Sequence, residues 1–92
     1  RGARVRAPYE GRVVYGDWLP GMGLMLVIDH GSGYMSLYGH NEELFRKVGE
    51  NVAGGDVIGS VGDSGGHSQP ALYFEVRRGK TPVDPQTWLA RK

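Results

Sequence analysis

The sequence predicts a mainly β domain, a small antiparallel sheet with at most one short helix. Three observations support this. Glycine is the outlier of the composition, at 16 of 92 residues, and it recurs between short apolar runs, as tight turns require. Several runs alternate apolar and polar residues, which is the period of a strand with one buried face. No strand–helix–strand spacing occurs, so antiparallel pairing is expected.

The first half of the chain contains four predicted strands. Residues 4–8 form a short strand that ends at a proline, which cannot donate to a ladder. Gly11–Leu19 is rich in β-branched and aromatic residues. Leu24–Ile28 is continuously apolar, so it is expected to be central and covered on both faces. Tyr34–His40 alternates again. One of its faces carries Tyr34, Ser36, Tyr38 and His40.

The second half begins with the only segment of helical character, Asn41–Lys47, in which an Asn can cap and acidic residues occupy the first turn. Strands are predicted at Asp56–Val61 and Ala71–Arg77. The tail over residues 79–92 contains two prolines and is expected to be irregular. Three apolar residues are expected to pin it to the body: Val83, Trp88 and Leu89.

Bulk composition excludes several classes of protein. Residues 1–92 are long enough for a single domain with a thin core. Without cysteine, neither a disulfide nor a thiolate metal site can form. A net charge of +1 gives no strong attraction to nucleic acid, and no apolar run reaches the roughly 18 residues that span a bilayer. We therefore expect neither nucleic-acid binding nor membrane insertion.

The stretch Val61–Arg78, VGDSGGHSQPALYFEVRR, carries the information on function. A loop of small residues leads into a strand whose side chains alternate between two faces. One face is expected to be core: Leu72, Phe74 and Val76. The other is expected to face solvent or a partner: Ala71, Tyr73, Glu75 and Arg77.

This stretch resembles the signature of the LytM/lysostaphin-type zinc endopeptidases, in which a small-residue loop precedes His-x-His-Phe-Glu. Here Ala71 and Tyr73 stand where the two histidines would be, while Phe74 and Glu75 remain. Further segments resemble other motifs of the family and extend the likeness to nearly the whole chain: Ala3–Val14, Gly23–His40, Val48–Gly62 and Val83–Trp88. The resemblance implies a degenerate domain of the LytM, or duplicated-hybrid-motif, type.

Two long segments, Tyr15–Asn41 and Val61–Lys80, are similar in wording to a non-enzymatic branch, the EnvC-type murein hydrolase activators. This likeness implies a periplasmic protein of the cell envelope that activates N-acetylmuramyl-L-alanine amidases during cell separation at the division site. Members of that branch carry an N-terminal coiled coil. We therefore expect residues 1–92 to be the C-terminal part of a longer protein.

The resemblance also allows catalysis to be weighed. A catalytic zinc needs three protein ligands and an open position, which the family draws from His-x-x-x-Asp and the second His of His-x-His. No His precedes His30, and Tyr73 occupies the third ligand position. A phenol with a pKa of about 10 is a poor substitute for imidazole at neutral pH, and Ala71 has no proton to exchange. We expect no catalytic residue, no metal and no cofactor.

Other candidate residues receive structural interpretations. His40 resembles a histidine that stabilises the transition state in active relatives, but without its partners it is interpreted as structural or groove-lining. His30 lies in a predicted turn and is expected to bond backbone. A new metal site of His40, His67 and Asp63 is an alternative that no spacing demands. Ser64 lacks the strand-to-helix elbow of a hydrolase nucleophile.

The leading hypothesis is therefore an emptied active-site groove that docks a segment of a partner amidase, with peptidoglycan as a possible second partner. Its expected partner-binding residues are Met22, Tyr38, His40, Tyr73, Glu75 and Arg77. One alternative is a zinc-dependent peptidoglycan endopeptidase with residual activity. Another is a structural β domain related to biotinyl or lipoyl carriers, but the chain lacks the exposed hairpin Lys that such a carrier needs.

Overall fold

The structure, a computed structural model, describes residues 2–65 and 71–90. Within them one curled sheet contains eight strands, and every strand pair is antiparallel. The strands are β1 Arg4–Arg6, β2 Gly11–Leu19, β3 Gly23–Gly31, β4 Tyr34–Leu44, β5 Asn51–Val52, β6 Val57–Val61, β7 Tyr73–Arg78 and β8 Thr81–Val83. The predicted mainly β, antiparallel class is confirmed.

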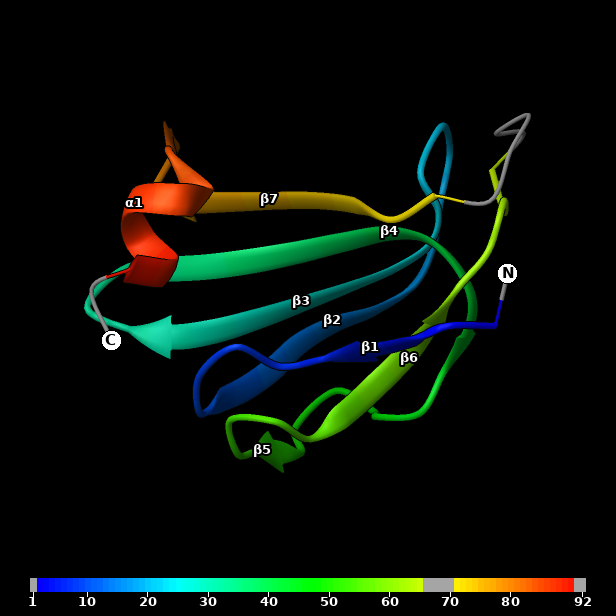
Figure 1. Cartoon of the computed structure of the whole chain (residues 1–92), viewed down its shortest axis with the longest axis horizontal. Helices are drawn as coiled ribbons and strands as arrows, with labels where there is room; N and C mark the ends of the chain where they lie inside the picture. The colour runs from blue at the N-terminus through cyan, green and yellow to red at the C-terminus, as the bar shows by residue number, and fades with distance from the viewer. Residues whose placement is uncertain (1, 66–70, 91–92) are drawn as a thin grey trace.

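Strand β4 is the centre of the sheet because it pairs along its length with three neighbours. Strand β3 lies on one side of it. On the other side, its first half pairs with β7 and its second half, from Asn41 to Leu44, pairs with β6. In Figure 1, β7 runs alongside β4, whereas β6 runs obliquely below β4 and lies next to β1.

The core fills the concave side of this curl. Its buried members come from six strands and one loop: Val5, Ala7, Val13, Leu26, Ile28, Tyr38, Val52 and Ile58. Leu72 and Phe74 pack against this cluster, and Val76 is fully buried. The predicted core face of the strand after the signature loop is therefore confirmed.

The helix predicted at Asn41–Lys47 is wrong. Strand β4 continues through Leu44, because the backbone of Asn41 pairs with Val61 instead of turning. The Asn41 side chain does not cap; it donates to the carbonyls of Leu24 and Tyr38, both at 3.0 Å. In a segment this short, the hydrogen bonds of a helix cannot offset the free-energy cost of helix nucleation, so pairing with a neighbouring strand is favoured.

The helix lies in the tail that was expected to be irregular. Helix α1 spans Pro85–Ala90 and follows β8. Pro85 stands at the first helical position, where its missing N–H costs nothing. Asp84 caps the helix, since its Oδ1 accepts from the Gln86 N–H at 3.0 Å. Trp88 on this helix is 6% exposed, which confirms that it pins the tail to the body.

Candidate functional site: the outer face of β7 and its neighbours

Three polar side chains of β7 form a bonded row on the outer face of the sheet. The Tyr73 hydroxyl donates to Oε1 of Glu75 at 2.5 Å, and Arg77 Nε donates to Oε2 of the same carboxylate at 2.5 Å. They face outward because their neighbours Phe74 and Val76 face the core. We call Tyr73, Glu75 and Arg77 the β7 row. Tyr73 is 38% exposed, so the row is open to a partner.

The row has a definite protonation state at neutral pH. Hydrogen bonds from Arg77 and then Tyr73 lower the pKa of Glu75, which remains a carboxylate. The hydrogen bond to Glu75 raises the pKa of Tyr73, which remains a phenol. The row therefore presents a neutral aromatic ring, a bridged carboxylate and a guanidinium.

An apolar row lies beside the polar one. In the β4–β7 register, Gly39, Leu37 and Met35 stand opposite Tyr73, Glu75 and Arg77 respectively. Residues directly opposite in a sheet point to the same face. Val27 of β3 stands opposite Leu37 and extends the apolar surface by one strand. Leu37, Met35 and Val27 are each half-buried.

Met22 borders this surface at the end nearest Tyr73. A Cβ on Gly39 would lie 2.8 Å from Met22 Cε and 3.3 Å from Tyr73 Cβ, so the Met22 side chain rests on the bare glycine next to Tyr73. The Met22 carbonyl accepts from the His40 N–H at 2.7 Å. The sequence predicted Met22 as a partner-binding residue but gave no sign of Gly39, whose small size makes room for the Met22 side chain.

His40 joins this end of the surface through an unusual backbone conformation. Its φ of 62° lies in the left-handed region, which non-glycine residues rarely adopt. The ring is 8% exposed, its Nδ1–H donates to the Ser64 carbonyl at 2.7 Å, and its centroid lies 6.5 Å from that of Tyr73, edge to face. The structure thus brings Met22, His40 and the β7 row together.

Ser64 holds the loop that borders His40. Its hydroxyl donates to the Asn41 carbonyl at 2.6 Å and accepts from the Leu24 N–H at 3.0 Å. Together with the His40 bond, these contacts tie the loop to β3 and β4. Ser64 also lies close to the end of the β2–β3 hairpin, since a Cβ on Gly23 would collide with the Ser64 Oγ. The structural interpretation of Ser64 agrees with these contacts.

Tyr38 does not belong with the other expected site residues. It stands opposite Phe74 in the register, so it points to the core face, where it is 2% exposed. Its ring packs on that of Phe74 at 5.4 Å, and its hydroxyl bonds Ser36. The expectation that Tyr38 lines an open groove floor is therefore wrong, because alternation along β4 sends it inward.

The donors near Tyr73 do not suit zinc. No group of three or more His, Cys, Asp or Glu side chains within residues 2–65 and 71–90 could hold a metal ion. Tyr73 remains protonated and bonded to Glu75, and Nδ1 of His40 is engaged by Ser64. The alternative site of His40, His67 and Asp63 includes His67, which lies outside the described residues.

The profile of "Peptidase family M23" matches residues 1–85. The chain belongs to peptidase family M23. The catalytic domain of lysostaphin from Staphylococcus simulans superposes on the M23 domain with a TM-score of 0.88 at 28% identity, covering 97% of this chain and 71% of that one. The LytM-type fold predicted from the resemblance is confirmed.

Two curated relatives are similar over almost all of the M23 domain. The murein hydrolase activator EnvC of Escherichia coli is 50% identical over 98% of this chain and 22% of its own length. The cell division protein DipM of Caulobacter vibrioides is 32% identical over 99% of this chain and 16% of its own length. The chain thus spans about a fifth of the curated relatives it matches.

In the part of the chain that the structure describes, no helix has the length and apolar character required to cross a membrane.

Proposed function

We propose that the M23 domain is a non-catalytic activator of N-acetylmuramyl-L-alanine amidases and acts in cell-wall splitting during cell division. In this proposal it works in the periplasm and docks a segment of the amidase on the outer face of β7 and β4. One observation carries the proposal. Tyr73, which in the sequence resemblance stands where a metal-binding His would be, has a phenol that stays protonated in a bonded row with Glu75 and Arg77.

The composition of the surface suits a protein partner. An exposed Tyr and an Arg provide a rigid aromatic contact and a bidentate donor, both enriched where protein interfaces concentrate their binding energy. The apolar row of Met35, Leu37 and Val27 lies beside them. An amphipathic segment can place its apolar side on that row and a carboxylate on Arg77.

Activation by such a surface needs no chemistry in the M23 domain. If the docked segment inhibits the amidase in its resting state, capture of the segment favours the open state of the enzyme. Only a difference in affinity between the two states is required. The likeness to EnvC, named as a murein hydrolase activator, supports this assignment. The name of DipM supports a place in cell division.

The test is amidase stimulation on purified cell wall by the Tyr73→Ala and Arg77→Ala variants. Each is expected to lower stimulation by about tenfold or more, as hot-spot truncations do. Lys80→Ala is the matched control, because it removes an exposed cation on the β7–β8 turn. Full stimulation by both folded row variants contradicts the docking surface. Zinc in the purified domain, with cell-wall cleavage by the domain alone, supports the endopeptidase alternative instead.

A further inference from the structure

A pocket lies on the opposite face of the sheet from the β7 row, at the start of β4. It has a volume of about 300 Å³ and is lined by Tyr9, Glu10, His30, Gly31, Ser32, Tyr34 and Trp88. Tyr34 is next to Met35, which stands opposite Arg77, but it points to the other face of the sheet because it alternates with Met35 and Leu37. The pocket is therefore a separate site.

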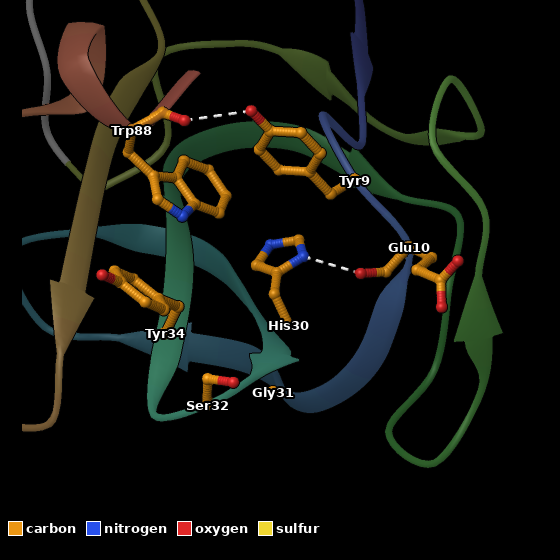
Figure 2. A pocket seen from close by; sticks show the side chains of 7 residues that line it. All are labelled: Tyr9, Glu10, His30, Gly31, Ser32, Tyr34 and Trp88. Atoms are coloured by element: carbon orange, nitrogen blue, oxygen red, sulfur yellow. Dashed lines mark hydrogen bonds between the residues drawn. The ribbon is translucent and has the colours of Figure 1, made fainter. Parts of the chain in front are cut away.

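Four rings from distant parts of the sequence surround this pocket. Figure 2 shows Tyr9, His30, Tyr34 and Trp88 directed toward one space, with the indole nitrogen facing the gap between Tyr34 and His30. The Trp88 centroid lies 4.7 Å from that of Tyr9, 5.0 Å from that of His30 and 6.3 Å from that of Tyr34. The planes of Tyr9 and Trp88 meet at 80°, so the rings form walls at an angle to one another.

Hydrogen bonds hold two of these rings in place. The Tyr9 hydroxyl bonds the carbonyls of Trp88 at 3.0 Å and Leu89 at 2.8 Å, which joins the loop before β2 to α1. His30 is tied at both nitrogens: Nδ1–H donates to the Glu10 carbonyl at 2.9 Å, and Nε2 accepts from the Ser36 hydroxyl at 2.6 Å. A pocket with rings fixed in advance loses little conformational entropy when a ligand binds.

The charge around the pocket favours a cation. Aromatic faces carry negative electrostatic potential. None of the seven lining residues is Lys or Arg. Glu10 turns its backbone carbonyl toward His30, and Figure 2 shows its carboxylate directed away from the rings. Burial lowers the pKa of His30, so its imidazole is neutral near pH 7. The Arg78 guanidinium lies 5.4 Å from the Tyr34 centroid, so an ammonium bound in the pocket would share this ring with a cation of the chain.

We propose that this aromatic pocket binds an alkylammonium group, the charged end of an aliphatic amine. The rings of Tyr9, Tyr34 and Trp88 contact the ammonium and its adjoining carbons, and the neutral His30 completes the wall. A volume of about 300 Å³ admits the ammonium with an aliphatic chain attached. Two sources carry such a group: the free amine of a peptide side chain and the headgroup of an aminophospholipid.

Binding of choline and of its uncharged isostere 3,3-dimethyl-1-butanol to the whole chain is measured first, with NMR as the readout. We expect choline to shift the indole signal of Trp88 and its own methyl protons to move upfield, with affinity at least about fivefold above that of the isostere. Equal binding of the two compounds, or no shift with choline at millimolar concentration, overturns the proposal.

Variants then locate the site and its source. Tyr34→Leu is expected to lower choline affinity about fivefold or more, whereas Tyr34→Phe keeps the aromatic face and retains binding. Tyr73→Ala, on the opposite face, is the control and leaves choline affinity unchanged. Unaltered affinity in folded Tyr34→Leu contradicts the assignment. Binding of Nα-acetyl-lysine methylamide would indicate that the ligand is a peptide side chain, and binding of vesicles that contain phosphatidylethanolamine would indicate a lipid headgroup. The Tyr34→Leu variant is expected to bind the active probe more weakly than the native chain does.

Discussion

Nε2 of His30 lies 2.6 Å from the hydroxyl oxygen of Ser36. The same hydroxyl lies 2.6 Å from that of Tyr38, so a line of hydrogen bonds runs from the Glu10 carbonyl at the surface through His30 into the core. Because the Glu10 carbonyl can only accept, Nδ1 of His30 carries the proton and Nε2 accepts from Ser36. This tautomer makes the neutral imidazole part of the folded structure.

The first prediction is that His30 makes stability fall on mild acidification. Burial lowers its pKa below the ordinary value of 6.5, and the Glu10 carbonyl and Asp29 charge only partly offset this effect. Below pH 6.5 the unfolded chain therefore binds more protons than the folded one, so the free energy of unfolding decreases as pH falls. Chemical denaturation at about pH 7.5 and about pH 5.5 measures this change.

The His30→Gln variant isolates this contribution from the other titrating groups. Glutamine has a donor and an acceptor but does not titrate. The loss of stability between the two pH values is expected to be smaller in the variant than in the native chain. An equal loss in both would show that groups other than His30 carry the pH dependence.

The second prediction compares two serines. Ser64→Ala removes the bond that its hydroxyl donates to the Asn41 carbonyl and the bond that it accepts from the Leu24 N–H, so the free energy of unfolding is expected to fall by about 1–3 kcal/mol. Ser60 is 5% exposed, and within the described part of the chain its hydroxyl has no hydrogen-bond partner. Ser60→Ala is therefore expected to be neutral or stabilising. Urea unfolding of both variants measures the two changes in stability. Equal destabilisation by Ser64→Ala and Ser60→Ala would contradict the prediction that only the Ser64 hydroxyl stabilises the fold.

The third prediction concerns the bare surface beneath Met22. Gly39→Ala places a methyl 2.8 Å from Met22 Cε, the mobile end of a flexible side chain, so Met22 must move. We expect stability to change by less than about 1.5 kcal/mol and amidase stimulation to decrease, because the border next to Tyr73 is altered.

The control for this variant is Gly16→Ala, since the nearest atom to an added Cβ there is a Leu26 methyl at 3.4 Å. It is expected to leave stimulation unchanged. Full stimulation by folded Gly39→Ala would mean that Met22 does not border the docking surface.

The fourth prediction tests the cap of α1. Asp84→Ala removes the acceptor of the Gln86 N–H and of the Thr87 hydroxyl, at 3.0 and 3.2 Å. The expected cost is about 1 kcal/mol, with a change in Trp fluorescence as Trp88 gains exposure. Asp84→Asn keeps a capping oxygen and is expected to retain most of the stability. Equal losses in both variants would show that the carboxylate charge, and not the cap, matters.

Prediction from the sequence succeeded where local pattern and burial agree. The predicted strand Gly11–Leu19 has the same first and last residues as β2, because its β-branched and aromatic residues favour a strand over any other structure. Leu72, Phe74 and Val76 face the core, as strict alternation requires. His30 bonds backbone as expected, although it lies near the end of β3 and not in a turn.

Prediction failed where a remote partner decides the outcome. Asn41–Lys47 has a helical composition, but β6 offers Asn41 a ladder that a short helix cannot match. The Asp-Pro pair that begins α1 was a readable signal for a helix start, and it was read only as a breaker. The aromatic pocket unites Tyr9, His30 and Trp88, whose distances along the chain give no hint of contact.

The sequence by itself determined most of the strand content and the inward face of β7, because periodicity and residue identity are local properties. Only the tertiary structure decided that Tyr38 lies in the core while Met22 and Gly39 border Tyr73, and that Trp88 closes a pocket over His30. Register and packing between distant segments set these positions, and a single residue of shift in register would send each strand side chain to the other face.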